Sequence, residues 1–204
     1  MGIAVFAVAF GYVEASVVVY LRALYYPEGF SLPPKPIEPS ILVAEIGREL
    51  ATIMMLVAAA LLAGDRRWTR FGMFLVAFGV WDIFYYVWLK VLLDWPVSLV
   101  DWDMLFLIPI PWIAPVLAPV VISLIMITAG VLFVRAEERG RRVRVPMPAW
   151  IACTLGVGIV LFSFLRDTRP SVHFQTPEPY PYTLFSVGVL CLVAALVLTF
   201  LRRR

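Results

Sequence analysis

The segment 41-ILVAEIGRELATIMMLVAAALLA-63 decides the fold class, because it is long, almost entirely apolar and free of proline. A helix needs about 20 such residues to cross the hydrocarbon core of a bilayer. The whole chain has the same character, with 62% hydrophobic and 15% charged residues among 204 and a mean hydropathy of +0.91. Soluble domains are about half apolar and a quarter charged. We therefore expect an all-α polytopic membrane protein that forms one transmembrane helical domain over residues 1–204.

Five further stretches meet the same criterion of length and hydropathy, which gives six predicted transmembrane helices in one bundle. The predicted spans are Ile3–Leu24, Ile41–Ala63, Phe71–Leu93, Ile113–Phe133, Ala149–Phe164 and Thr183–Leu201.

The connection between the third and fourth spans, Trp95–Trp112, has an unusual composition. It is too apolar for a solvated loop, and Asp101, Asp103, Pro109 and Pro111 interrupt it too often for a span. Irregular backbone at membrane depth must be covered by protein or by a wet cavity. We therefore predict an irregular or re-entrant segment between helices 3 and 4.

Arginine residues cluster in the connections on one side of the predicted bundle. They follow the second, fourth and sixth spans, at Arg66, Arg67, Arg70, Arg135, Arg139, Arg141, Arg142, Arg144 and Arg202–Arg204. Lys and Arg are retained on the cytoplasmic side during insertion. The sequence therefore predicts that both termini are cytoplasmic. The scarcity of lysine and the absence of asparagine favour a GC-rich prokaryotic genome, and hence a prokaryotic cytoplasmic (inner) membrane.

Prolines fill two connections on the opposite side of the bundle. They are Pro27, Pro33, Pro34, Pro36 and Pro39 in one connection, and Pro170, Pro177, Pro179 and Pro181 in the other. Proline fixes its own backbone dihedral and biases the preceding residue to extended structure. We expect stiff loops that lie over the outer end of the bundle as a lid.

Ionisable and other polar side chains interrupt the first three spans at helical spacing, so each set lies on one helix face. Such residues are rare in membrane spans and usually face the bundle interior. The sets are Glu14 and Arg22 in the first span, Glu45, Arg48, Glu49 and Thr52 in the second, and Asp82, Tyr86 and Lys90 in the third. We expect the three faces to meet in the outer half of the bundle.

The carboxylates in these sets outnumber the cations. Either one carboxyl is protonated or a bound cation or basic ligand supplies the missing charge. We assign Glu45, Glu49 and Asp82 to cation or proton binding, with Arg48 positioning them or meeting an anionic group. The alternative for any single pair is an interhelical salt bridge that fixes packing and has no chemical role.

Two carboxylates two residues apart, Asp101 and Asp103, form a short candidate motif for a divalent cation. The alternative for this pair is that both carboxylates are solvated charges at the membrane interface, with no bound cation.

His173 is the only histidine, so the chain cannot supply a bis-histidine haem site or a multi-histidine zinc site. Nucleic-acid binding is not expected either, because it requires a basic face on a soluble surface and this composition provides no soluble domain.

The leading hypothesis is a small membrane protein with an outward-facing pocket for a small ligand or cation, as a transporter component or a subunit of a larger membrane complex. A second hypothesis is a membrane-embedded enzyme that acts on a lipid-linked substrate at the outer leaflet, with Glu45 or Glu49 as acid or base. A third is a structural subunit whose charged residues form interhelical salt bridges. In span number and length alone, the chain resembles the substrate-capturing membrane subunits of energy-coupling vitamin importers, whose sites open outward.

Overall fold

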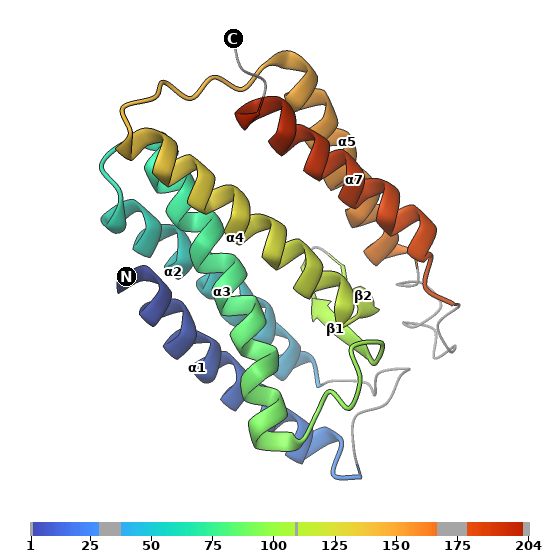
Figure 1. The fold of residues 1–204 in the computed structure, drawn as a ribbon. Helices are drawn as coiled ribbons and strands as arrows, with labels where there is room; N and C mark the ends of the chain where they lie inside the picture. The colour runs from blue at the N-terminus through green and yellow to red at the C-terminus, as the bar shows by residue number, and fades with distance from the viewer. Residues whose placement is uncertain (1, 29–37, 109, 167–178, 202–204) are drawn as a thin grey trace.

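The computed structural model describes residues 2–28, 38–108, 110–166 and 179–201. Six of its helices are long and apolar enough to cross a membrane, which confirms the prediction of a helical, multi-pass membrane protein. In chain order they are α1 (Gly2–Tyr25), α2 (Pro39–Ala63), α3 (Arg67–Leu93), α4 (Leu117–Glu138), α5 (Met147–Leu165) and α7 (Tyr182–Phe200) (Figure 1). Many of their large apolar side chains are exposed, as expected for helices that face lipid.

A two-stranded antiparallel hairpin occupies the connection between α3 and α4. Strand β1 (Trp102–Phe106) pairs with β2 (Trp112–Pro115), and Asp103 lies opposite Ala114. The fourth helix consequently begins at Leu117, not at Ile113 as expected from hydropathy, because residues 112–115 pair with a strand instead of with the helix. The hairpin packs beside the start of α4 (Figure 1), and its strands carry Asp103 and the aromatic residues Trp102, Phe106 and Trp112.

Helix α3 is the centre of the larger group of helices, with α1, α2 and α4 packed around it (Figure 1). It approaches α4 closely along glycine positions. A Cβ atom on Gly72 would lie 2.7 Å from the carbonyl oxygen of Gly130, and one on Gly79 would lie 2.6 Å from that of Ser123. Small residues allow helix backbones to approach in this way, which increases van der Waals contact where lipid removes the usual hydrophobic driving force.

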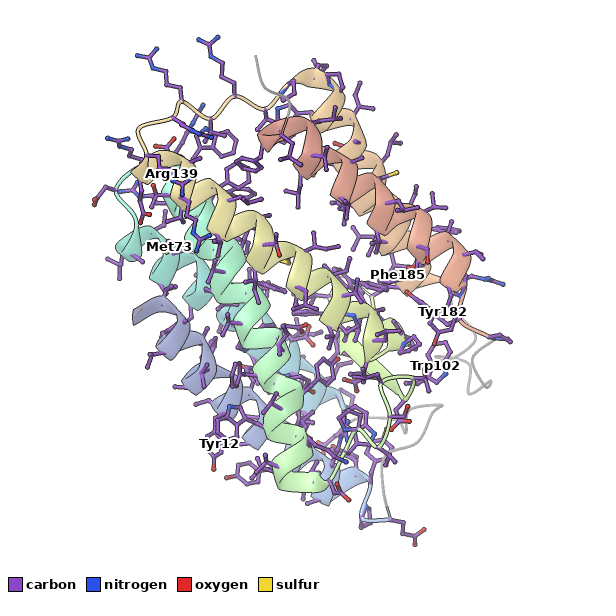
Figure 2. All side chains as sticks on the ribbon, viewed as in Figure 1. Tyr12, Met73, Trp102, Arg139, Tyr182 and Phe185 are labelled. Carbon is purple, nitrogen blue, oxygen red and sulfur yellow. The ribbon has the colours of Figure 1, made fainter. Side chains whose placement is uncertain are left out.

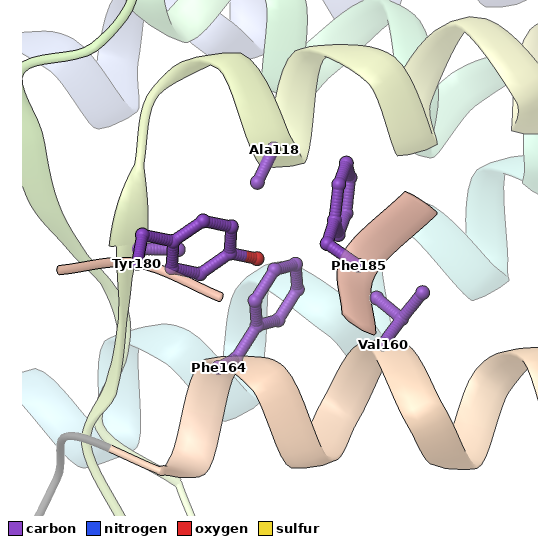
Figure 3. Close-up of a cluster of buried hydrophobic side chains, with 6 residues drawn as sticks. Ala118, Val160, Phe164, Tyr180 and Phe185 are labelled. Atoms are coloured by element: carbon purple, nitrogen blue, oxygen red, sulfur yellow. The ribbon is translucent and has the colours of Figure 1, made fainter. Parts of the chain in front are cut away.

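Helices α5 and α7 form a separate antiparallel pair beside α4 (Figure 1). A Cβ atom on Gly156 would lie 2.9 Å from the carbonyl oxygen of Gly188, whereas one on Gly158 would meet nothing within 4 Å. At the hairpin end, Phe164 and Phe185 join the pair to Tyr180 and to Ala118 of α4 in a buried cluster (Figure 3). The α5/α7 pair is therefore joined to α4 at this cluster, and Phe200 of α7 also packs on Phe133 of α4, with ring centroids 5.0 Å apart.

The antiparallel succession of helices places the first residues of α3 and the last residues of α4 at the same end of the molecule. Figure 2 shows Met73 and Arg139 at this end, with Trp102, Tyr182 and Phe185 toward the hairpin end. Several residues that carried sequence predictions lie outside the described ranges. These are Pro33, Pro34, Pro36, Pro109, Pro170, Pro177, His173 and Arg202–Arg204.

Candidate functional site

A partly open cavity of about 140 Å³ lies between α1, α2, α3 and the hairpin. Seven of the eight ligand- or proton-binding residues predicted from the sequence line it, together with Asp103 of the predicted metal pair. Its polar and charged lining residues are Glu14, Arg22, Glu45, Arg48, Glu49, Thr52, Asp82, Tyr85, Tyr86 and Asp103. The helical spacing of the polar residues therefore brings three helix faces together, and β1 closes the cavity with a fifth carboxylate.

Arg48 of α2 links two of the carboxylates. Its guanidinium donates to Glu45 one turn earlier, with Nε 2.9 Å and Nη2 2.8 Å from Oε2, and its Nη1 donates to Glu14 of α1. The other oxygen of Glu14 accepts a 2.7 Å hydrogen bond from the hydroxyl of Thr52. Both glutamates are buried, whereas the Arg48 side chain keeps 24% of its surface exposed. Arg48 is thus held firmly on one side while it remains accessible from the cavity.

Glu49 has a different kind of partner. Both of its carboxylate oxygens accept from the backbone N–H of Leu107, at 3.0 and 2.9 Å, just after β1. The carboxylate is buried, and no side-chain cation forms an ion pair with it in the described residues. Sequence reasoning placed Arg48 between two glutamates of α2, but the structure pairs Arg48 with Glu45 and Glu14 and leaves Glu49 to the hairpin backbone. The negative charge of Glu49 is therefore only partly compensated.

Asp103 projects from β1 against α1 and α3. Its carboxylate lies 3.5 Å from Nη2 of Arg22 and accepts a 3.1 Å hydrogen bond from the hydroxyl of Tyr86. The Arg22 guanidinium also lies 3.7 Å from the centroid of the Trp95 ring, a cation–π geometry. Burial raises the pKa of Asp103 to about 6, although Arg22 and the hydrogen bond from Tyr86 oppose this rise. Burial thus disfavours the ionised form of this carboxyl, and a bound cation would favour it.

Asp82 of α3 completes the acidic lining. Its Oδ2 accepts a 2.7 Å hydrogen bond from the hydroxyl of Ser123, which is fully buried in α4. No ion pair to Asp82 forms among the described residues, so it too lacks a neutralising cation. Sequence reasoning did not identify Ser123, because a single serine in an apolar span carries no recognisable signal.

Aromatic side chains form much of the remaining wall. Trp81 stacks near Tyr85 with ring centroids 6.5 Å apart, and Phe106 of the hairpin lies 6.3 Å from Trp81. The indole N–H of Trp81 is buried without a hydrogen-bond partner, although Trp81 lines the cavity. A buried donor without an acceptor is costly, so this N–H is a ready partner for a ligand or a water molecule in the cavity.

Two of the predicted site residues lie elsewhere. Lys90, expected on the same face as Asp82 and Tyr86, is half exposed and forms a 2.7 Å ion pair with Asp94 at the end of α3. Asp101 precedes β1, and its carboxylate accepts from the backbone N–H groups of Val97 and Ser98, at 2.7 and 3.1 Å. The structure therefore gives the two members of the predicted divalent-cation pair, Asp101 and Asp103, separate partners. Over the described ranges, no three His, Cys, Asp or Glu side chains gather as metal ligands.

No protein-family model, curated protein or solved structure matches this chain.

Proposed function

We propose that the protein binds a small cation in this cavity, with organic ammonium and guanidinium ions as the preferred class, and that it acts as a transporter component or as the binding subunit of a larger membrane complex. The observation that carries the proposal is the imbalance of charge. Five buried carboxylates and only two guanidinium groups line a single cavity. Isolated charges are expensive to bury, so this imbalance favours a cationic ligand or proton uptake.

The side chains also support an organic cation. Trp81, Tyr85 and Phe106 present ring surfaces beside the carboxylates, and aromatic faces attract ammonium and guanidinium ions. The unpartnered indole N–H of Trp81 offers a donor to an organic cation that also carries an oxygen atom, such as the hydroxyl of choline. The cavity volume of about 140 Å³ resembles that of an engineered cavity of about 150 Å³ that holds benzene. A ligand of a few non-hydrogen atoms therefore fits.

The proposed topology places this cavity on the outer side of a prokaryotic inner membrane. The arginines that flank α3 and α4, including Arg70 and Arg135, lie at the end opposite the cavity, which is the expected cytoplasmic end. In this orientation the six helices form one bundle, the hairpin is a re-entrant element at the outer surface, and both termini are cytoplasmic. A fluorescent reporter fused to the C-terminus would fluoresce in the cytoplasm, whereas a periplasmic phosphatase fused there would stay inactive.

The proposal is tested by cation binding to the purified full chain in lipid nanodiscs. The probes are guanidinium, ethylammonium and choline, with Mg²⁺ and Ca²⁺ as separate arms, and the readouts are thermal unfolding and titration calorimetry. A ligand at 100 times its Kd stabilises the folded state by about 2.7 kcal/mol. We expect an organic cation to raise Tm and the divalent ions to have a smaller effect.

Glu49→Gln is the decisive variant, because the glutamine oxygen can still accept from the N–H of Leu107 while the charge is lost. We expect its affinity for the cation to fall about tenfold or more. Asp94→Asn is the matched control, since it removes one acid outside the cavity and its affinity should stay unchanged. If Glu49→Gln and Asp82→Asn lower Tm but every probe binds the variants as it binds the parent protein, the charged residues are structural and the proposal fails.

A further inference from the structure

A second cavity, of about 430 Å³ and more open to solvent than the first, lies at the opposite end of the helices, where the start of α3 meets the end of α4 and the connection to α5. It is lined by Arg66, Arg67, Trp68, Glu137, Arg142, Val143 and Arg144. Four guanidinium groups therefore surround a space that contains one carboxylate, which is the reverse of the charge pattern in the first cavity.

The single carboxylate neutralises only part of this charge. Glu137 lies 3.5 Å from Arg66, and its side chain is only 12% exposed. Arg142 and Arg144 form no ion pair within the described residues. The cavity consequently carries excess positive charge on arginine, the side chain whose planar fork best matches phosphate oxygens.

The cavity wall is ordered by aromatic packing. Trp68 stacks on Phe133 with ring centroids 4.9 Å apart and an interplanar angle of 6°, which ties the first turn of α3 to the end of α4. The guanidinium of Arg67 lies 5.6 Å from the centroid of the Trp68 ring. No side chain caps the start of α3, so the N–H groups of its first turn add unsatisfied donors and the positive end of the helix dipole at this place.

We propose that this cavity binds a phosphate-bearing anion, either the phosphodiester headgroup of an anionic phospholipid in the adjacent leaflet or free phosphate. The two sources share the chemistry that the arginines recognise. Basic pockets between transmembrane helices on the cytoplasmic side hold anionic headgroups in this way. Phe71, one turn along α3, is exposed and contacts Trp68 edge-on, so it presents an apolar surface for acyl chains beside the cavity.

The test compares two double variants of the same connection. Arg142→Gln with Arg144→Gln removes two cavity arginines, and Arg139→Gln with Arg141→Gln removes two arginines that do not line the cavity. Both variants lose the same charge at the same end of the protein. Delipidated full chain in detergent is titrated with phosphatidylglycerol, phosphatidylcholine or inorganic phosphate, and bound lipid is counted by native mass spectrometry while phosphate binding is followed by calorimetry.

We expect the parent protein to prefer phosphatidylglycerol over phosphatidylcholine. The cavity variant should bind phosphatidylglycerol about 100-fold more weakly, because two charged hydrogen bonds are lost. The control should weaken by less than about tenfold, through diffuse attraction alone. Binding of inorganic phosphate with the same dependence on Arg142 and Arg144 identifies free phosphate as sufficient, whereas binding of lipid alone identifies the headgroup. Equal losses in the two variants, or no preference for either phosphate source over phosphatidylcholine, overturn the proposal.

Discussion

The group α1–α4 and the pair α5/α7 are packed by different means, although both consist of helices long and apolar enough to cross a membrane. Helices α5 and α7 contain no Asp, Glu, Lys, Arg or His and meet at Gly156 and Gly188. Helices α1, α2 and α3 bury five charged side chains along one cavity, with Asp103 of the hairpin beside them. Since small residues suffice to pack α5 against α7, close packing of apolar helices in this protein does not in itself require buried charge. The charged cavity therefore offers groups for a polar ligand that helices α5 and α7 lack.

The largest expected effect follows from removing Arg48, which links the carboxylates of Glu14 and Glu45. Arg48→Met leaves both buried glutamates without their cation. Breaking a buried pair from one side destabilises a protein by about 3–5 kcal/mol, and we expect a large drop in Tm in reconstituted protein.

A triple variant separates function from packing in this experiment. Arg48→Met combined with Glu14→Gln and Glu45→Gln replaces all three ions by neutral groups, and such replacement is often close to neutral for stability. We expect the triple variant to recover most of the lost Tm and to lose cation binding. If Arg48→Met alone unfolds at the same temperature as the parent protein, the described ion pairs do not stabilise α1 against α2.

The next largest expected effect is on the stability of the α5/α7 pair, where alanine substitutions at two glycines of α5 can be compared. A Cβ at Gly156 would press on the Gly188 carbonyl and on Leu192, whereas a Cβ at Gly158 would meet no atom within 4 Å. Overpacking of this kind destabilises by about 1–3 kcal/mol. Alanine in an open helical position is more favourable than glycine by about 0.5–1 kcal/mol. Gly156→Ala should therefore lower Tm and Gly158→Ala should raise it slightly, and a fall of similar size in both would refute close packing at Gly156.

The six spans could be predicted from the sequence, because length and hydropathy are local properties. The helical spacing of Glu45, Glu49 and Asp82 likewise predicts a shared face. The pairing of β1 with β2 could not be predicted, since it depends on contacts between separate segments and on a hairpin within an apolar run. The partner of Glu49 could not be predicted either, because it is the backbone N–H of Leu107 and a backbone group has no signal in the sequence of side chains.

Two residues show how periodicity misleads near the end of an element. Lys90 has the spacing to share a face with Asp82, but it lies in the last turn of α3, where its ammonium reaches the exposed carboxylate of Asp94. Asp101 and Asp103 would share a face in a strand, yet only Asp103 belongs to β1, and Asp101 instead accepts from backbone N–H groups before it. The sequence spacing was informative within regular elements and uninformative where an element ended.

The smallest expected effect is the difference in stability loss between two serine substitutions, one in each group of helices. Ser123 and Ser163 are both almost fully buried, and each hydroxyl forms a hydrogen bond to a side chain from a different element. Ser123 donates to the carboxylate of Asp82 at 2.7 Å, whereas Ser163 donates to the backbone carbonyl of Val160 at 2.7 Å and lies 3.0 Å from the hydroxyl of Tyr180. The same change to alanine therefore removes a bond to a charge in one region and a bond between neutral groups in the other.

Hydrogen bonds to charged groups contribute about 1.5–3 kcal/mol, and neutral ones about 0.5–1.5 kcal/mol. Ser123→Ala should consequently destabilise more than Ser163→Ala when both are measured by denaturant or thermal unfolding in the same lipid. Measuring the cation affinity of both variants tests whether Ser123 also affects the cavity, which unfolding measurements do not report. Ser123→Ala exposes the charge of Asp82 to the cavity without its donor, so it should change the affinity for a cation, whereas Ser163→Ala should leave it unchanged. Equal effects of the two substitutions on both measurements would mean that the charged cavity and the apolar pair do not differ in the way their structures indicate.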